Sequence, residues 1–423
     1  MNDNANKRIG IFEYDWSMYS FIKDFAVKLA EAGYFVDIFF RDWEVGRQCI
    51  DNSEFNLYQN IRFFDFTIQP TRRQIFKRRY NRLLNRLAIL FRLPRNEGPN
   101  DIIDQRILNK TKEIIGKSQY YCFVGIEKKG LVWAGILSEM YHCPLIYHSL
   151  ELYTRDHPGV DRFYHLLDAE SKYHRQAAAT IIQDDLRADI LLKHNGVEQA
   201  NVLYYPVCVR GNVIREKSNY LRNKFSIGND KKIILYFGGL EESRCVTQMV
   251  RMARNLDNDV VLVVHGWGRQ IYLDYLQLIA DKKKIIFSWD FLPEDEIASM
   301  VSSSDIGIAL YDMGNFNDRL VAFSSSKIAY YMQCGVPMIS FDTESFRKLV
   351  NSCQCAELIT SVDETPQKVQ EILKDYDFYR QQSYSAYQRF YALDENFSKL
   401  LDKLEPIVNG AQSVIGEDNA TVM

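Results

Sequence analysis

The stretch Lys232–Arg244, KIILYFGGLEESR, joins an apolar run to two glycines and a polar segment. The run Lys232–Phe237 predicts a buried strand, and a helix is expected to begin near Arg244. Glycines at such a junction let backbone amides approach a phosphate, and the N-terminus of a helix adds partial positive charge. The stretch therefore predicts a strand–turn–helix unit that can hold an anion. An ordinary turn with a surface arginine is the alternative.

Similar apolar runs lie on both sides of this stretch, and helical segments follow most of them. The runs are 8–12, 35–40, 120–126, 144–148, 179–183 and 201–205 before it, and 260–265, 284–287, 305–310 and 336–340 after it. Such alternation is typical of parallel strands with helices on both faces of the sheet. The polar residues 210–230 interrupt the pattern, and we interpret them as a connection between domains. We predict an α/β protein with two doubly wound domains that face each other across a cleft.

Bulk composition favours a globular protein of two domains. The chain has 423 residues, of which 47% are hydrophobic and 25% charged, and its net charge of −3 gives no support for a nucleic-acid partner. Its eight cysteines form no CxxC pair, which argues against a zinc site and favours a reducing cytosol. The polar N-terminus does not resemble a signal peptide, and no apolar run is long enough to span a membrane.

The segment 324–337, SSSKIAYYMQCGVP, predicts a serine-capped short helix, a glycine stop and a new strand. A lysine in the first turn of a helix opposes the helix dipole unless an anion binds there. Ser325, Ser326 and Lys327, with the free helix amides, would form a cradle for a diphosphate. A solvated lysine on an ordinary helix is the alternative. A second glycine-bearing turn is predicted at a strand end in His265-Gly266-Trp267-Gly268.

The order of these motifs resembles the retaining GT-B glycosyltransferases (group 1, family 4-like) of bacterial polysaccharide or glycolipid assembly. Gly238 and Arg244 keep that family's six-residue step, Gly266 begins its G-x-G turn, and residues 334–337 (CGVP) keep its closing tetrad. Residues 290–292 resemble the segment whose backbone reads the nucleotide base. In the first half, residues 146–153 (IYHSLELY), and Glu170 before residues 175–182, resemble two further family stretches. The likeness runs in order over most of Arg8–Val408.

This resemblance implies the GT-B fold, with two Rossmann-like domains. An N-terminal domain on the acceptor side would span residues 1–208, and a C-terminal domain that binds the nucleotide sugar would span residues 209–376. Helices within 377–408 would return to the N-terminal domain. The small and polar residues 409–423 are expected to form a disordered tail.

The resemblance also assigns roles to individual residues. Arg244 and Lys327 would bind the donor diphosphate and stabilise the leaving nucleotide, so that neither a metal nor another cofactor is required. His148 would face the donor sugar and Glu151 would orient hydroxyl groups, although either could be purely structural. The remaining donor-binding candidates are Gly238, Gly239, Gly266, Phe291, Leu292, Ser325, Ser326 and Tyr330.

The sequence departs from the family pattern at three positions. Gly239 stands where the family often has arginine, and Ala322 and Tyr330 stand where it often has two glutamates. A tyrosine hydroxyl can still bond to a ribose hydroxyl, but alanine cannot replace a carboxylate. Asn317 or Asp318 in the preceding loop could contact the sugar instead. The donor sugar and the stereochemical outcome therefore stay open.

Residues 71–95 carry nine basic side chains and no acidic one. Apolar residues recur among them at helical spacing, which is the pattern of a helix that lies on an anionic membrane surface. We expect the contact to involve Arg78, Arg79, Arg82 and Arg86. A solvated basic face and RNA binding are the alternatives.

These observations predict a cytoplasmic hexosyl-type glycosyltransferase that associates peripherally with the inner face of the membrane. It would move a sugar from a UDP or GDP donor to a saccharide or lipid-linked acceptor in polysaccharide or glycolipid biosynthesis. An epimerase of nucleotide sugars, or an inverting transferase, would share the same phosphate site. A non-catalytic subunit that binds a membrane or a partner enzyme is the third possibility, and Gly239 and Ala322 favour it.

Overall fold

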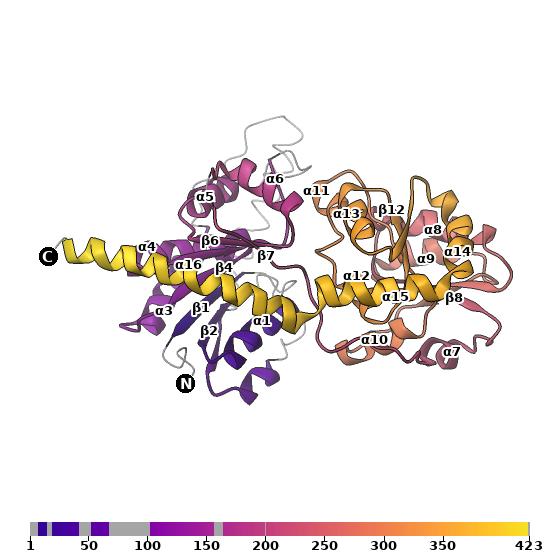
Figure 1. Cartoon of the computed structure of the whole chain (residues 1–423), viewed down its shortest axis with the longest axis horizontal. Coiled ribbons are helices and arrows are strands. Elements are labelled where there is room, and N and C mark those ends of the chain that lie inside the picture. The colour runs from indigo at the N-terminus through magenta and orange to yellow at the C-terminus, as the bar shows by residue number, and fades with distance from the viewer. Residues whose placement is uncertain are drawn as a thin grey trace. The chain divides into compact units, whose positions relative to one another are not determined.

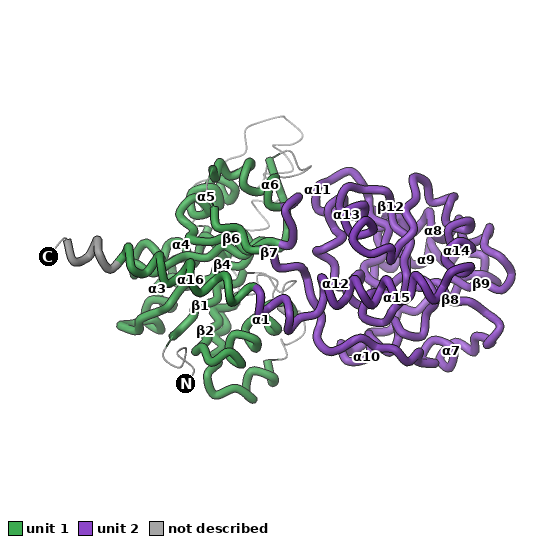
Figure 2. Tube along the Cα trace, in the orientation of Figure 1, with its two compact units in different colours: residues 1–182, 188–203, 400–423 green, residues 183–187, 204–399 purple. Residues whose placement is uncertain are grey.

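The chain folds into two compact units, each built around one sheet. The computed structural model describes residues 7–14, 19–41, 52–66, 102–155, 164–198 and 200–421. Unit 1 comprises residues 1–182, 188–203 and 400–423, and unit 2 comprises residues 183–187 and 204–399 (Figure 2).

Unit 1 holds a seven-stranded sheet in the order β3-β2-β1-β4-β5-β6-β7. Its strands are β1 (Arg8–Glu13), β2 (Phe35–Phe40), β3 (Ile61–Asp65), β4 (Cys122–Ile126), β5 (Leu145–His148), β6 (Ala179–Ile182) and β7 (Val202–Tyr204). Its helices are α1 (Tyr19–Glu31), η2 (Ser53–Leu57), α3 (Gln105–Ile115), α4 (Glu127–Tyr141), α5 (Tyr164–His174), α6 (Asp185–Asn195) and the last part of α16 (Leu393–Thr421) (Figure 1). The strand order reverses between β1 and β4, so the carboxyl ends of these two strands flank the topological switch point.

Unit 2 holds a six-stranded parallel sheet in the order β10-β9-β8-β11-β12-β13. Its strands are β8 (Lys232–Leu240), β9 (Val260–Gly268), β10 (Ile285–Ser288), β11 (Ile306–Ala309), β12 (Met338–Phe341) and β13 (Ala356–Ile359). Its helices are α7 (Tyr220–Phe225), η4 (Glu242–Arg244), α8 (Val246–Met252), η5 (Ala253–Asn255), α9 (Gln270–Ile279), α10 (Glu294–Ser302), α11 (Phe316–Arg319), α12 (Ser326–Gln333), α13 (Glu344–Ser352), η6 (Val362–Glu364), α14 (Thr365–Lys374), α15 (Tyr376–Ala386) and η7 (Tyr387–Tyr391). The switch point of this sheet lies between β8 and β11.

The predicted class, two Rossmann-like parallel sheets with helices, is confirmed, while β3 and β13 are strands that the sequence analysis did not predict. Two predicted turns are wrong. Gly238 and Gly266 lie inside β8 and β9 and pair with each other in register. A Cβ added to Gly266 would lie 1.9 Å from the carbonyl oxygen of Gly238. Glycine is therefore required at Gly266 because two backbones approach closely there, and not because the chain turns.

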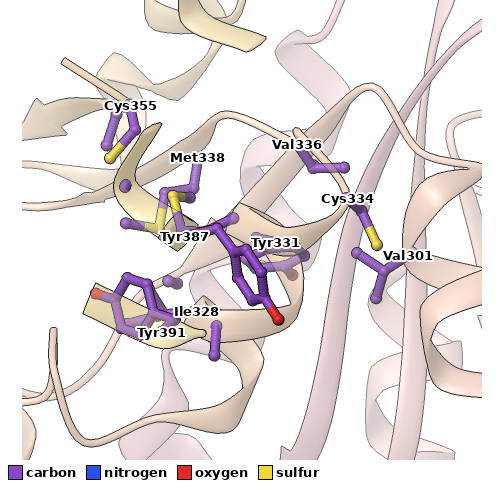
Figure 3. Close-up of a cluster of buried hydrophobic side chains, with 14 of the residues drawn as sticks. Val301, Ile328, Tyr331, Cys334, Val336, Met338, Cys355, Tyr387 and Tyr391 are labelled. Carbon is purple, nitrogen blue, oxygen red and sulfur yellow. The ribbon is translucent and has the colours of Figure 1, made fainter. Parts of the chain in front are cut away.

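The core beneath one face of the second sheet fixes the position of α12 (Figure 3). The buried Tyr331 hydroxyl donates to the carbonyl of Leu235 in β8 over 2.7 Å. At the end of the helix, the amides of Gly335 and Val336 donate to the carbonyls of Met332 and Tyr331, which is a Schellman motif. Gly335 has φ +62°, and a Cβ there would meet the Tyr384 ring at 2.3 Å, so the predicted glycine stop is confirmed.

Two segments differ from the expectations for linkers and tails. Residues 210–230, interpreted as a connection between domains, belong to unit 2, where Gln333 donates to the carbonyl of Arg210 over 2.6 Å. The expected disordered tail is instead helical as far as Thr421, because α16 continues through it. Near its start this segment contacts the rest of unit 1, because the side chains of Asn409 and Gln412 bond to the hydroxyl and carbonyl of Tyr121 at 2.9 and 2.8 Å.

Candidate functional site

Lys327 is a buried cation at the start of α12. Its side chain is only 8% exposed, and its ammonium nitrogen lies 4.0 Å from the centre of the Tyr236 ring and 5.2 Å from that of Tyr311. No carboxylate in the described part of the chain forms an ion pair with it. Burial, together with the positive charge of Arg244, lowers the pKa of Lys327 to about 7. The alternative of a solvated lysine on an ordinary helix is wrong, because the residue is buried and lies over two tyrosine rings.

Gly238 makes room for this lysine. Gly238 has φ +127°, a conformation that disfavours a side chain, and a Cβ there would lie 3.3 Å from Cε of Lys327. Tyr331, one helical turn after Lys327, anchors α12 to β8. The glycine in the strand and the anchored helix together hold the ammonium group beside the carboxyl end of β8.

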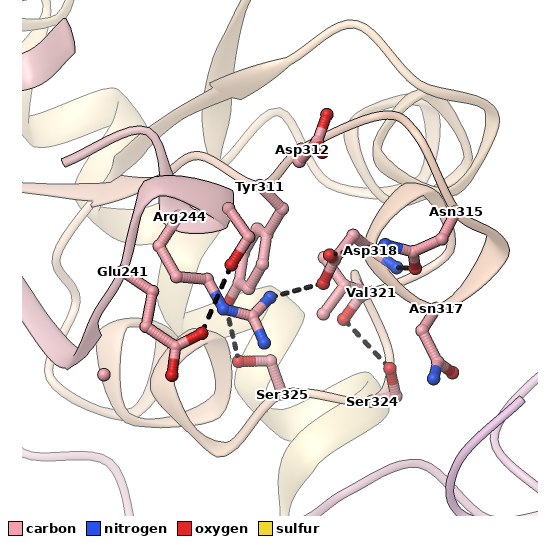
Figure 4. Close-up of polar contacts among 12 residues, drawn as sticks. Glu241, Arg244, Tyr311, Asp312, Asn315, Asn317, Asp318, Val321, Ser324 and Ser325 are labelled. Carbon is pink, nitrogen blue, oxygen red and sulfur yellow. Dashed lines mark hydrogen bonds and ion pairs between the residues drawn. The ribbon is translucent and has the colours of Figure 1, made fainter. Parts of the chain in front are cut away.

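Arg244, in η4 after β8, supplies the second cation of this cluster (Figure 4). It donates a hydrogen bond to Asp318, and its guanidinium carbon lies 4.9 Å from the centre of the Tyr311 ring. Asp318 in turn accepts from the side-chain amide of Asn315 over 2.9 Å. Burial lowers the pKa of Arg244, but the attraction and hydrogen bond of Asp318, together with the neighbouring tyrosines, raise this pKa by more. Arg244 and Lys327 therefore lie over one ring, and only the arginine has a carboxylate partner among the described residues.

The serine residues before α12 do not cap the helix as predicted. Ser325 is the N-cap residue, but its hydroxyl bonds to the Tyr311 hydroxyl at 2.9 Å and not to a helix amide. Ser326 is exposed in the first turn. The first amides of α12 thus receive no side-chain cap from Ser325, and they add partial positive charge beside Lys327.

These groups make a candidate anion site at the switch point of the second sheet. Two cations, two tyrosine rings and a helix N-terminus converge there, and Lys327 is short of negative charge in the described structure. An anion with two phosphate groups would restore the proton to Lys327 and could contact Arg244 without a metal. The arrangement can therefore bind a diphosphate and stabilise it as a leaving group.

The other donor-binding candidates lie around this site in unit 2. A Cβ on Gly239 would meet nothing within 4 Å, so this position borders open space. Phe291 is 83% exposed, and Trp267 at the end of β9 is 72% exposed, which leaves both rings available for stacking. Leu292 and Tyr330 pack against the core with partial burial. Ala322 is fully buried and has no carboxylate, so the position at which the family often has a glutamate offers none here.

Asn317 and Asp318, suggested as sugar contacts in a loop, lie instead in the short helix α11 and take part in contacts of their own. Asp318 is only 9% exposed and is occupied by Arg244 and Asn315. The side-chain oxygen of Asn317 accepts from Arg187 over 2.9 Å.

His148 and Glu151 lie in unit 1, at and just after the end of β5. His148 is fully buried, with the rings of Phe21 and Phe25 packed edge-on against it at 5.0 and 5.3 Å. Burial lowers the pKa of His148 to about 3, so the ring is neutral at physiological pH. The amide of Glu151 donates to a carboxylate oxygen of Glu127 over 2.7 Å.

Glu127 is a feature that the sequence analysis missed. It follows β4, has φ +56° without being glycine, and accepts from the amides of Leu150 and Glu151. Burial raises the pKa of Glu127 to about 7. A glutamate directly after a buried strand was the only sequence signal. The backbone strain and the two amide contacts appear only in the fold.

Two Asp-x-Asp triplets, a pattern that can hold a divalent ion on a diphosphate, occur in the chain at 257–259 and 375–377. The first lies in the turn before β9, at the amino end of that strand, and the second lies where α15 begins. No cluster of histidine, cysteine or acidic residues suited to a metal occurs within the described residues.

The basic segment with Arg78, Arg79, Arg82 and Arg86 lies outside the described residues, so its predicted membrane contact stays a prediction. Among the helices that the structure describes, none has the length and apolar character needed to cross a membrane.

Comparison with known proteins agrees with the fold described above. Residues 218–389 match the family model described as glycosyl transferases group 1. A search of curated proteins found no match. Among solved structures, HepE of Anabaena in complex with UDP is similar, with 13% identity and a TM-score of 0.66, over 95% of this chain and 100% of HepE.

Two other solved structures are alike to a similar degree. Sucrose-phosphate synthase of Thermosynechococcus elongatus has 14% identity and a TM-score of 0.63, over 98% of this chain and 100% of its own. A glycosyltransferase of Rickettsia africae has 13% identity and a TM-score of 0.66, over 96% of this chain and 99% of its own. The two sheets and these likenesses define the GT-B fold of glycosyltransferases. The match to the group 1 glycosyl transferases covers residues 218–389, which lie within unit 2.

Proposed function

We propose that this protein transfers a hexosyl group from a UDP or GDP sugar to a saccharide or lipid-linked acceptor. Lys327 carries the proposal. A buried lysine that lacks a carboxylate partner in the described structure is costly, and a bound diphosphate would supply the missing charge. The UDP in the similar HepE complex favours the same ligand class.

In this proposal Lys327 and Arg244 neutralise the charge that develops on the nucleotide diphosphate as the sugar departs. Preorganised cations in a site from which water is excluded are effective at this task, so the reaction would not require a metal. The exposed rings of Phe291 and Trp267 would stack on the base, and Tyr330 would bond to the ribose. The fully buried Ala322 leaves no carboxylate for the donor sugar at its position, so we assign that role to no residue of unit 2.

We further propose that unit 1 receives the acceptor and that the reaction retains configuration. Glu151 would orient hydroxyl groups, supported by its amide bond to Glu127. His148 is neutral and buried, which suits a ring that shapes the site without carrying charge. The basic segment would bring the enzyme to an anionic membrane on the cytoplasmic side, where lipid-linked acceptors occur.

The proposal is tested by nucleotide binding to Lys327→Met and to a matched control. Lys284→Met is that control, because Lys284 is also buried but donates to three acceptors: the carbonyls of Leu256 and Asp257 and the side chain of Asn258. UDP and GDP should raise the unfolding temperature of the wild type and of the Lys284 variant, whereas the Lys327 variant should lose the effect. Equal nucleotide protection in all three proteins would contradict the site.

Release of the nucleotide separates the candidate functions. A transferase releases UDP or GDP in step with the acceptor added, an epimerase interconverts the nucleotide sugar without acceptor, and an inert subunit does neither. Acceptor-dependent release that disappears in Lys327→Met would support the transferase.

A further inference from the structure

Unit 1 contains a second pair of cations over a tyrosine ring. The guanidinium carbon of Arg41 lies 4.8 Å from the centre of the Tyr14 ring, and the ammonium nitrogen of Lys129 lies 4.9 Å from it. The two cations are therefore no farther apart than the sum of these distances. In unit 2, Arg244 and Lys327 lie over Tyr311 in the same way.

The three side chains come from neighbouring strand ends. Tyr14 directly follows β1, Arg41 directly follows β2, and Lys129 lies in the first turn of α4, directly after β4. These strands are adjacent in the order β2-β1-β4, and the switch point of the sheet lies between β1 and β4. The amide of Arg41 donates to the carbonyl of Glu13 over 3.0 Å, which fixes the arginine beside the end of β1. Ligands of doubly wound sheets bind at this location.

Arg41 is buried without a counterion in the described structure. Only 8% of the residue is exposed, and its Nε and Nη1 atoms have no hydrogen-bond partner there. No carboxylate of the described residues forms an ion pair with it. The charge of Arg41 contributes to the lowered pKa of Asp104, but the two carboxylate oxygens of Asp104 are bonded to Arg106 at 2.6 and 3.0 Å.

Arg62 on the neighbouring strand β3 is an arginine of the same sheet whose guanidinium is paired with a carboxylate. Its guanidinium also lies over an aromatic ring, that of Phe64, at 5.4 Å. It donates to both oxygens of Asp37, at 2.7 and 2.6 Å. Cation–π contact alone does not offset the desolvation of a buried cation, and the half-exposed Arg62 has a carboxylate partner whereas the buried Arg41 has none among the described residues.

We propose that Arg41 binds a phosphate group of the acceptor, with Lys129 adding positive charge over the same tyrosine ring. A guanidinium presents two pairs of parallel N–H donors, Nε with Nη2 and Nη1 with Nη2, which match the oxygens of a phosphate. Each pair of Arg41 includes one atom without a partner in the described structure. This inference rests on the proposed transferase function and narrows its acceptor to a phosphorylated one, whether a sugar phosphate or a lipid-linked phosphate.

The first test uses inorganic phosphate as the probe, in protein saturated with UDP so that the donor site is filled. Calorimetry should show phosphate binding to the wild type and to the control Arg62→Gln. Arg41→Gln should bind phosphate at least about tenfold more weakly while it still binds UDP. Benzoate in place of phosphate tests a carboxylate, and binding of benzoate as tight as that of phosphate would overturn the assignment to phosphate.

The outcome is independent of the donor site. If UDP does not bind, the same titration in the Lys327→Met background still tests Arg41, so failure of the two proposals can be distinguished. If Arg41→Gln does not fold, Arg41→Lys keeps the charge but loses the fork and should weaken phosphate binding. Phosphate binding that is equal in the wild type and in the folded Arg41 variant, or absent from the wild type, would overturn the inference.

A transfer assay separates the two sources of phosphate. Arg41→Gln should raise KM for a sugar-phosphate acceptor or for a lipid-phosphate acceptor, and the acceptor whose KM responds identifies the source. The KM for the donor should not change. An equal change in KM for phosphorylated and neutral acceptors would show that Arg41 acts only on the fold.

Discussion

Donor binding should depend on pH through Lys327. Its pKa of about 7 in the unliganded protein means that about half of the molecules carry the charge at pH 7 and about one in a hundred at pH 9. A bound diphosphate favours the charged form and raises this pKa. The affinity for UDP is therefore greatest below pH 7 and falls as the pH rises above 7. Between pH 7 and pH 9 the dissociation constant for UDP should increase about 50-fold.

Calorimetry tests this directly. At pH 8, titration of UDP in buffers of different ionisation enthalpy should report the uptake of close to one proton per UDP bound. The phosphates of UDP are already ionised at this pH, so the proton must come to the protein. Lys284→Met should behave as the wild type. A dissociation constant that is constant between pH 7 and pH 9, or binding without proton uptake, would refute the reasoning.

The same depressed pKa affects stability. The folded-state pKa of Lys327 lies below its unfolded value of 10.5. Between about pH 7 and pH 10.5 this lysine therefore binds more protons in the unfolded chain than in the folded protein. The contribution of this lysine to stability therefore improves as the pH rises through that window and is least favourable below pH 7. Each unit of depressed pKa corresponds to about 1.4 kcal/mol, so Lys327→Met should stabilise the unliganded protein by several kcal/mol at pH 6. A lower unfolding temperature for this variant at pH 6 would contradict the assignment.

Three further outcomes are expected. Arg244→Ala should lower turnover by about 10²–10³-fold, because a preorganised charge is lost, whereas the exposed Arg251→Ala in α8 should not; normal turnover in the Arg244 variant would refute the role. Activity should survive EDTA, and complete loss that Mn²⁺ restores would mean that a metal holds the diphosphate. The protein should sediment with anionic but not neutral vesicles, and less so as salt rises, because each basic group near the surface contributes about 1 kcal/mol. Changing Arg78, Arg79, Arg82 and Arg86 to glutamate should abolish sedimentation without affecting UDP binding.

The sequence by itself determined the two-sheet architecture and the proposed ligand end of the second sheet. Apolar runs alternating with helical segments are local patterns, and they predicted nearly all strands of both sheets. The glycine stop at Gly335 and the lysine in the first turn of α12 were likewise visible, because helix termini depend on a few consecutive residues. Where the pattern was weak, as at β3 and β13, the strands were missed.

Only the tertiary structure decided the chemical state of the charged side chains. Asp318 lies 74 residues from Arg244, and no local pattern indicates that the two pair. Lys327 is buried because Tyr236 in β8 and Tyr311 just after β11 both lie against it. Arg41 and Lys129 lie over the Tyr14 ring for the same reason. The order of the strands in a sheet decides which strand ends meet, and the periodicity of a sequence contains no information about that order.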